Sequence, residues 1–387
     1  MTVLDTIVIG LGAMGAAALD HLARRGQRVL GLERFGPAHD RGSSHGRSRA
    51  IRLAYFEDPC YVPLLRRAYE NWRDLERRTG TALLTVTGTL EIGAPDSEVV
   101  AGSLASCRQH ALAHDLLDAA ALRSRWPVFE LPGHYVGLLQ PEGGYLLPEE
   151  AIRASLAAAT RAGAIVRFDE RVLGLEPRPG HVVVETGQGT YAAGQVVVAA
   201  GAWAGGLVPG LAPFLRPTRQ VLGWFRPRDL APFALGRLPV FIVDDGPEGD
   251  HYGFPAFEDA SVKIARHGHL DEVIDPEAPC AAPSAADVAV LRRFLARRMP
   301  ALDGEPVRLA TCTYTGLPGG FFLIDRAPAD ERILVASPCS GHGFKFASVV
   351  GEILADLVAQ GRTAQPIAPF SWHAMAARAC LETLTDP

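Results

Sequence analysis

Lysine is almost absent from this chain of 387 residues, although Lys and Arg together number 38. Only Lys263 and Lys345 are lysines, and every other basic residue is arginine. Arginine replaces lysine freely at a protein surface, whereas a site that needs a compact ammonium group with an adjustable pKa requires lysine. We therefore treat Lys263 and Lys345 as candidate functional residues, with chance survival as the alternative.

The sequence also lacks a clustered basic region, because its formal net charge of −5 is spread along the chain. Nucleic acid and anionic membranes both bind through such clusters, so neither is expected as a main partner. The six cysteines stand far apart and form no C-x-x-C pair. We therefore expect neither a disulfide framework nor a zinc ribbon.

No hydrophobic run has the features of a leader or a membrane helix. Residues 7–19 are interrupted by three glycines and follow Asp5 instead of a positively charged segment, so we do not expect a signal peptide. Residues 196–215 are uncharged, but their Gly and Pro residues would break a helix in a bilayer. They predict a buried strand followed by a loop, and the expected compartment is the cytoplasm.

The first 33 residues, by contrast, carry a clear pattern. Residues 6–9 and 28–32 are apolar runs of strand length, and residues 14–25 have apolar positions at helical spacing. This order predicts a strand, a helix and a second strand, which is the unit that opens a Rossmann-like α/β domain.

A G-x-G-x-x-G motif, made by Gly10, Gly12 and Gly15, lies between the first strand and the helix. The first glycine permits a tight turn, the second lets the backbone approach a pyrophosphate, and the third allows the helix to pack on the strand. Glu33 ends the second strand, where an acid accepts hydrogen bonds from a ribose hydroxyl. The motif predicts a dinucleotide site, with a glycine turn that binds no ligand as the alternative.

Later segments predict that the chain leaves this domain and returns to it. Residues 149–360 contain further expected elements of the first domain: a helix at 149–163, strands at 165–168, 173–185, 195–199 and 333–336, and a glycine turn at 340–343 that opens a helix ending near residue 360. In residues 85–144 and 217–315 the alternating runs are shorter and the loops irregular. We expect a second, antiparallel sheet-rich domain, and both domains are then discontinuous in sequence.

Three separate segments resemble one known family. Residues 42–52 read GSSHGRSRAIR, residues 311–315 read TCTYT, and residues 340–345 read SGHGFK. Together they are similar to the monomeric sarcosine oxidase family, which includes N-methyltryptophan oxidase and pipecolate oxidase. The resemblance covers essentially the whole chain. It implies an FAD-binding domain formed by 1–84, 149–216 and 320–387, and a substrate domain formed by 85–148 and 217–319.

The resemblance implies FAD attached through a thioether between its 8α-methyl carbon and Cys312, although a free cysteine is more often a small buried hydrophobe. Val172 stands where the family backbone meets the adenine. The residues expected to bind the cofactor are Gly10, Gly12, Gly15, Glu33, Arg34, Ser43, Val172, Gly201, Cys312, Gly341, Gly343 and Lys345.

The resemblance also implies an active site. Arg49 and His45 match residues beside the isoalloxazine ring, and Arg52 and Lys345 match the pair that holds the substrate carboxylate. A surface salt-bridge cluster is the alternative for these arginines. Lys263 matches the residue assigned to oxygen activation.

The substrate pocket is implied at Tyr252, His267 and Tyr314. For His267, a hydrogen-bonded core histidine is the alternative. A metal site on His267 and His269 lacks a third ligand at suitable spacing, so no metal is expected.

The implied activity is oxidation of a secondary or N-methyl amino acid: hydride transfer to flavin N5, hydrolysis of the imine, and reoxidation by O2 to give H2O2, in a monomer. The alternatives are a flavin dehydrogenase that uses a quinone or carrier protein, an oxidase of a cyclic imino acid such as pipecolate, an NAD-dependent dehydrogenase, and a non-catalytic binding module.

The sequence departs from the family pattern at Arg47, at residues 315–322 and at Pro338-Cys339. The identity of the substrate side chain therefore stays open.

Overall fold

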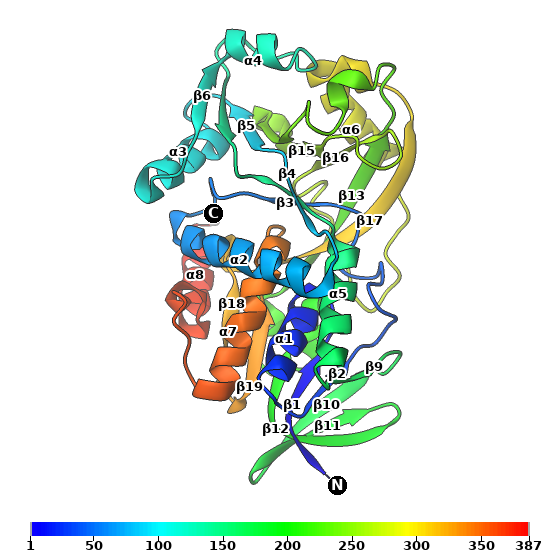
Figure 1. The fold of residues 1–387 in the computed structure, drawn as a ribbon, viewed down its shortest axis with the longest axis vertical. Helices are drawn as coiled ribbons and strands as arrows, with labels where there is room; N and C mark the ends of the chain where they lie inside the picture. Colours follow the sequence, from blue (N-terminus) through cyan, green and yellow to red (C-terminus); the bar gives the residue numbers. More distant parts are fainter. Residues whose placement is uncertain (1, 386–387) are drawn as a thin grey trace.

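The computed structural model describes residues 2–385 and contains two large sheets and one small one (Figure 1). The first large sheet lies in the lower half of the view in Figure 1, with helices across one of its faces, and the second lies in the upper half. The predicted α/β class is confirmed, since helices and both parallel and antiparallel strands are present.

The first sheet is built around five parallel strands in the order β9 (Ile165–Arg167), β2 (Val29–Leu32), β1 (Val3–Ile9), β12 (Gly189–Val198) and β19 (Asp330–Ser337). Three antiparallel strands extend it, namely β10 (Val172–Arg178), β11 (His181–Thr186) and β18 (Leu323–Ala327). Strands that are far apart in sequence thus meet in one sheet, as expected for a chain that returns to its first domain.

Helices α1 (Ala13–Arg24), α5 (Pro148–Arg161) and α7 (Ala347–Gln360) lie over this sheet, and α1 contacts both α5 and α7 (Figure 1). Helix α1 begins directly after the glycine turn, where Gly12 is the N-cap in an extended conformation. Its predicted apolar positions Ala16, Leu19 and Leu22 are fully buried. Burial of this side explains why the short helix is stable, because isolated helices of this length are marginal in water.

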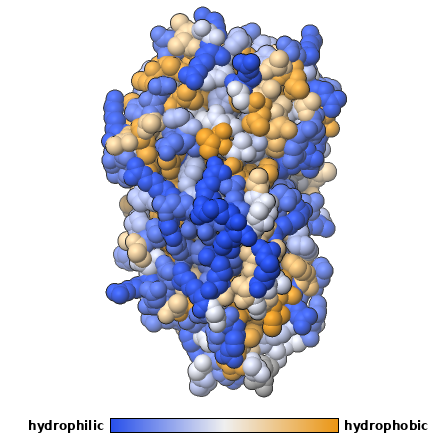
Figure 2. All heavy atoms as spheres, in the orientation of Figure 1, coloured by the Kyte–Doolittle hydropathy of each residue, from blue (hydrophilic) through white to orange (hydrophobic). Residues whose placement is uncertain are grey.

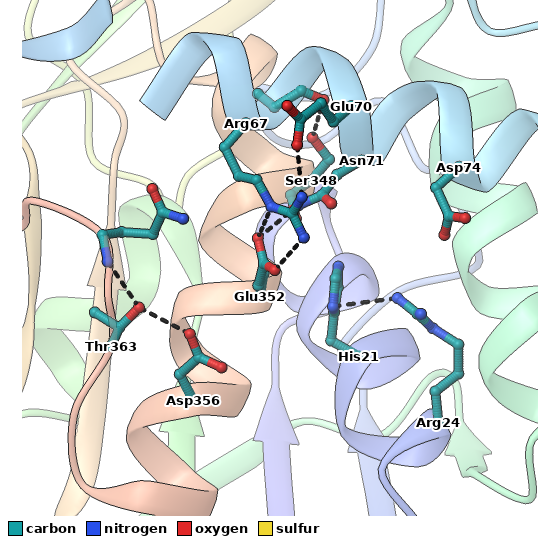
Figure 3. Close-up of polar contacts among 12 residues, drawn as sticks. His21, Arg24, Arg67, Glu70, Asn71, Asp74, Ser348, Glu352, Asp356 and Thr363 are labelled. Carbon is teal, nitrogen blue, oxygen red and sulfur yellow. Dashed lines mark hydrogen bonds and ion pairs between the residues drawn. The ribbon is translucent and has the colours of Figure 1, made fainter. Parts of the chain in front are cut away.

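Helix α2 (Val62–Thr79) crosses this layer and is fixed to α7 by polar contacts (Figure 3). The Glu352 carboxylate accepts hydrogen bonds from Arg67 Nε at 2.8 Å and Nη2 at 2.6 Å, and from the Asn71 amide at 2.9 Å. Hydrophilic side chains gather over α2 and α1 on the face shown in Figure 2. None of the helices among residues 2–385 is both long enough and apolar enough to cross a membrane.

The second large sheet has eight strands. Their order is β17 (Pro306–Gly316), β13 (Arg216–Phe225), β16 (Val262–Arg266), β15 (Asp250–Phe254), β14 (Val240–Asp244), β5 (Thr89–Gly93), β7 (Val136–Gln140) and β6 (Asp115–Asp118). All pairs are antiparallel except β14 with β5. Helix α6 (Ala285–Arg298) packs on one face and buries Leu291, Phe294 and Leu295.

A small antiparallel sheet contains three strands in the order β3 (Arg49–Ile51), β8 (Gly144–Leu146) and β4 (Leu84–Val86). The strands of the first large sheet fall within 1–84, 149–216 and 320–387. The strands of the second fall within 85–148 and 217–319, apart from Arg216 at the start of β13. The domain limits themselves stay a prediction.

Candidate active site

A cavity of about 300 Å³ is lined by residues of both large sheets, which come from segments distant in sequence. It extends from the start of α1 and the end of β2, past residues 42–52, to β17 and the turn before α7. Most of the predicted site residues line it: Gly10, Gly12, Glu33, Arg34, Ser43, Arg49, Arg52, Val172, Gly201, Tyr252, His267, Cys312, Tyr314, Gly341, Gly343 and Lys345.

The three glycines of the G-x-G-x-x-G motif have different surroundings. Gly10 has a φ of +85°, and a Cβ there would lie 2.6 Å from the Ala199 carbonyl oxygen. A Cβ on Gly15 would lie 1.7 Å from the Gly10 oxygen, so Gly15 serves packing and does not line the cavity. A Cβ on Gly12 would meet only Ser44 Oγ, at 3.6 Å. Gly12 therefore leaves the start of α1 open to the cavity.

Glu33 lies at the end of β2 with only 5% of its surface exposed. Its carboxylate accepts hydrogen bonds from the backbone N–H groups of Leu11 at 2.7 Å and Phe35 at 3.0 Å. Arg34, the next residue, pairs with Glu277 through both guanidinium ends at 2.9 and 3.0 Å. Glu277 also contacts Arg171 at 3.2 Å, so a loop that follows β16 reaches this end of the cavity.

These residues fit an FAD molecule. The N-cap residue of α1, Gly12, has no side chain, and the Ala13 N–H has only a long contact of 3.4 Å with Ser44 Oγ, so the start of the helix and its dipole can accept a pyrophosphate. Glu33 stands at the ribose position that the G-x-G-x-x-G unit predicts. At the other end, the Cys312 thiol lines the cavity from β17 and is 3% exposed. The Arg49 guanidinium lies 3.4 Å from the Cys312 sulfur and donates a hydrogen bond to the Ser43 carbonyl at 2.8 Å.

Lys263 and His45 lie behind the cavity wall and do not line the cavity. The Lys263 ammonium donates hydrogen bonds to the carbonyls of Gly46 and Ser48, both at 2.8 Å, and to the Ser48 hydroxyl at 3.2 Å. Burial and the charge of Arg49 hold the pKa of Lys263 well below its usual value. The same two causes lower the pKa of His45 to about 4, and its Nε2 has no hydrogen-bond partner within residues 2–385.

Two buried basic residues, Arg52 and Lys345, also line the cavity. Arg52 is 2% exposed, so the alternative of a surface salt bridge is wrong for this residue. Its Nη2 lies 2.9 and 2.7 Å from the two Glu57 carboxylate oxygens. The Lys345 ammonium donates a hydrogen bond to the His342 carbonyl at 2.8 Å. Burial, together with the nearby Arg52 charge, lowers the pKa of Lys345 to about 7.

Aromatic side chains complete the cavity near these cations. The hydroxyl groups of Tyr252 and Tyr314 lie 3.5 Å apart, and the His267 ring lies 5.3 Å from the Tyr314 ring. Gly341 has a φ of +81°, and a Cβ there would lie 2.6 Å from the Tyr314 ring and 2.8 Å from the His267 ring. His269 points elsewhere and forms a hydrogen bond with Asp287.

Some residues in the site were not indicated by the sequence motifs. Glu57 holds Arg52, and the buried Glu91 lies 3.8 Å from Arg52 Nε. A charged residue within the apolar strand at 89–93 was the available signal for Glu91. Of the departures from the family pattern, Pro338 and Cys339 line the cavity, whereas Arg47 pairs with Glu258 and Asp259 outside it.

The fold and the cavity define a flavin-dependent oxidoreductase, and the model of the family described as FAD dependent oxidoreductase matches residues 5–357. Relatives narrow this class. A monomeric sarcosine oxidase of Streptomyces avermitilis is 44% identical over 379 residues, which are 96% of this chain and 98% of that protein. An N-methyl-L-tryptophan oxidase of Salmonella enteritidis is 37% identical over 369 residues, 95% of this chain and 97% of that protein. The chain therefore belongs to the FAD-dependent oxidoreductases, among the monomeric sarcosine oxidases and N-methyltryptophan oxidases.

Solved structures agree on the fold. NikD, an unusual amino acid oxidase essential for nikkomycin biosynthesis, matches with a TM-score of 0.83 at 27% identity, over 96% of this chain and 98% of that chain. Glycine oxidase from Geobacillus kaustophilus matches with a TM-score of 0.78 at 22% identity, over the same shares. The second likeness concerns the fold alone.

Proposed function

We propose that this protein oxidises a secondary or N-methyl amino acid and passes the electrons to oxygen. The C–N bond of the substrate becomes an imine, which water hydrolyses, and O2 takes up the two electrons and two protons as H2O2. FAD, when bound, supplies the acceptor for the hydride and the route to oxygen. The observation that carries the proposal is a cavity in which Arg52 and Lys345 face a thiol and two tyrosines.

Arg52 and Lys345 suit the acid group of such a substrate. A guanidinium and an ammonium together hold a carboxylate in one orientation, which fixes the neighbouring carbon and nitrogen as well. The same two cations lower the pKa of a nearby amine and favour its neutral form. The neutral form is the one that can release a hydride, so the site both orients the substrate and prepares it.

We assign the remaining predicted residues by their places in the site. Arg49 and His45 would lie beside the flavin ring, and Tyr252, Tyr314 and His267 would surround the substrate. Lys263 would stabilise the negative charge that develops as oxygen is reduced. Cys312 would carry the thioether to FAD. We also propose that the enzyme is a cytoplasmic monomer with the two-domain division given above.

A peroxide-coupled screen of N-methyl and cyclic amino acids tests the function. We expect H2O2 formation and bleaching of the flavin absorbance with at least one of these substrates under air. A flavin dehydrogenase would bleach without forming H2O2 and would need a quinone or carrier protein to turn over. Protein that showed no bleaching with any amine would contradict the proposal.

A further inference from the structure

Arg52 already has a carboxylate partner, Glu57, so the acid group of a substrate meets a competitor for the guanidinium. The guanidinium donates to both Glu57 oxygens through Nη2 and to the Ala54 carbonyl through Nη1, at 2.7 Å. The Tyr55 and Phe56 rings lie 4.4 and 4.3 Å from its central carbon. A substrate carboxylate that binds Arg52 therefore competes with Glu57 for the guanidinium.

A second acid lies next to Arg52. Glu91, on β5, is completely buried, and its Oε1 lies 3.8 Å from Arg52 Nε, which is an ion-pair contact beyond hydrogen-bond distance. Neither carboxyl oxygen has a hydrogen-bond partner in the part of the chain that the structure describes. Its strand partner Ile242 lines the cavity, and paired residues share one face of a sheet. Glu91 is thus part of the wall against which Arg52 lies.

The single positive charge of Arg52 neutralises one carboxylate, and the environments of Glu57 and Glu91 determine which of the two acids is ionised. Burial raises the pKa of Glu91 to about 8 against the pull of Arg52. Burial is the largest single effect on Glu57 and disfavours its ionised form, but the charges of Arg52, His342 and Lys345 and the hydrogen bond from Arg52 together lower the pKa of Glu57 to about 2. At neutral pH, Glu57 is therefore ionised and Glu91 is a neutral acid.

The other elements packed near Glu91 offer no further cation. Its strand partners Ile242 and Leu138 are apolar. Besides Arg52 and Glu57, the titratable groups that interact with Glu91 are Tyr69 on α2 and Cys107 on α3 (Glu98–His110), and both have a raised pKa. Arg52 is therefore the cation that an ionised Glu91 would engage.

We propose that Glu91 is a positioning residue for Arg52. As a neutral acid it leaves the guanidinium free to exchange Glu57 for the substrate carboxylate, and as a carboxylate it retains the guanidinium. This inference rests on the proposed function, in which Arg52 binds the acid group of the substrate. Its consequence is that substrate affinity falls as Glu91 ionises, while the rate of the bound complex does not change for this reason.

The test measures binding of methoxyacetate, which has the carboxylate of N-methylglycine and an ether oxygen in place of the titrating amine. Its Kd for the flavin-loaded enzyme is followed by flavin absorbance from pH 6 to 9.5, in the wild type and in Glu91→Gln. Both enzymes lose affinity as Lys345 deprotonates. Only the wild type should lose about a further tenfold between pH 7 and pH 9, because an acid of pKa about 8 is then mostly ionised.

Kinetics give a second readout that a merely structural role would not produce. With a substrate that the enzyme turns over, the ratio of wild-type KM to Glu91→Gln KM should rise with pH by the same factor, while kcat of the two enzymes stays similar. Glu91→Met gives the same comparison should the amide variant fail to fold. Asp250→Asn is the matched control, since Asp250 lines the cavity and burial, with the Asp244 charge, raises its pKa to about 6.

Parallel pH curves for the wild type and Glu91→Gln would overturn the inference, and so would loss of the alkaline difference in Asp250→Asn. A wild-type enzyme that neither binds methoxyacetate nor oxidises any N-methyl amino acid would instead remove the proposed function. The two failures are therefore distinguishable.

Discussion

Lys263 keeps its ammonium group inside the protein by donating to three oxygen atoms of residues 46–48. Such a group costs desolvation energy, which hydrogen bonds to carbonyls only partly offset. Because the positive charge lies directly behind the segment that carries Arg49, its field reaches the cavity without a contact to substrate. This arrangement suits a residue that acts on charge developing during the reaction.

Replacing Lys263 with Met should slow reaction with oxygen by about 10²–10³-fold, since a preorganised charge contributes several kcal/mol to a developing anion. Reduction of the flavin by substrate should change far less. Stopped-flow absorbance measures the two half-reactions separately. Equal slowing of both would show that Lys263 supports the site as a whole and has no particular role toward oxygen.

Cys312→Ser should give an enzyme whose flavin is released into the supernatant when the protein is precipitated with acid. The physical reason is that a serine hydroxyl is a much poorer nucleophile than a thiolate, so no bond to the 8α-methyl carbon forms. Cys339→Ser is the control, because Cys339 lines the same cavity and its variant should keep a yellow pellet. A colourless pellet from the wild type would show that FAD is not attached covalently to Cys312.

At this scale, motifs predicted Cys312, Arg52 and Lys345, and the structure brings all three to one cavity. Glu57 and Glu91 could not be predicted in the same way. Glu57 is an ordinary acid in a polar turn by sequence, and its meaning depends on where Arg52 points. Glu91 alternates with Leu90 and Ile92, which is the pattern of a strand with one solvated face. Both faces are buried here, because every residue of β5 is buried and Arg52 lies against Glu91.

At the scale of elements, Asp287 connects strand β13, the turn after β16 and the start of helix α6. Its carboxylate accepts hydrogen bonds from Arg219 on β13 at 3.0 and 2.8 Å and contacts His269 Nε2 at 2.8 Å. It also forms the capping box of α6 with Ser284. Hydrogen bonds from Arg219 lower the pKa of Asp287 below its usual value, although burial opposes this.

Asp287→Asn should destabilise the protein by about 3 kcal/mol, because it removes the buried carboxylate that pairs with Arg219 and leaves only the more exposed Glu272 beside that charge. Chemical denaturation measures the change. Asp303→Asn breaks an exposed pair with Arg292 and should cost less than about 0.5 kcal/mol.

The pH dependence has a definite sign. A carboxyl whose folded pKa is depressed contributes stability above its unfolded pKa, near 3.8, and loses it as the pH falls through the folded value. The variant should therefore lose less stability than the wild type on acidification below about pH 4. An equal loss of stability in the wild type and in Asp287→Asn below about pH 4 would contradict a stabilising role for the ionised Asp287 carboxylate.

The early strand–helix–strand unit was predictable because its hydrophobic periods and its glycines agree with one another. Helix α2 was not marked by any motif. One side of α2 is buried and the other forms ion pairs. The ion pair of Arg67 with Glu352 exists only because α7 packs beside α2. Long-range pairing explains the difference, since local patterns do not specify which distant carboxylate an arginine will find.

At the scale of the whole molecule, the cavity depends on both large sheets, because each supplies part of its lining. The helix start and Glu33 come with the first sheet, and Cys312, Tyr252 and His267 come with the second. The sequence indicated two discontinuous domains, but the cavity depends on how the sheets meet. For the same reason, residues 46–48, whose oxygen atoms accept hydrogen bonds from Lys263, acquire this role only in the folded chain.

The burial of both lysines has a practical consequence. Lys263 and Lys345 are 2% and 6% exposed, so a lysine-specific protease finds no accessible cleavage site in the native protein. Cleavage then requires opening of the fold, and its rate follows the population of the opened state when reclosing is fast. Digestion by such an enzyme, compared with digestion by an arginine-specific one that can reach surface loops, would thus report global unfolding separately from local fraying.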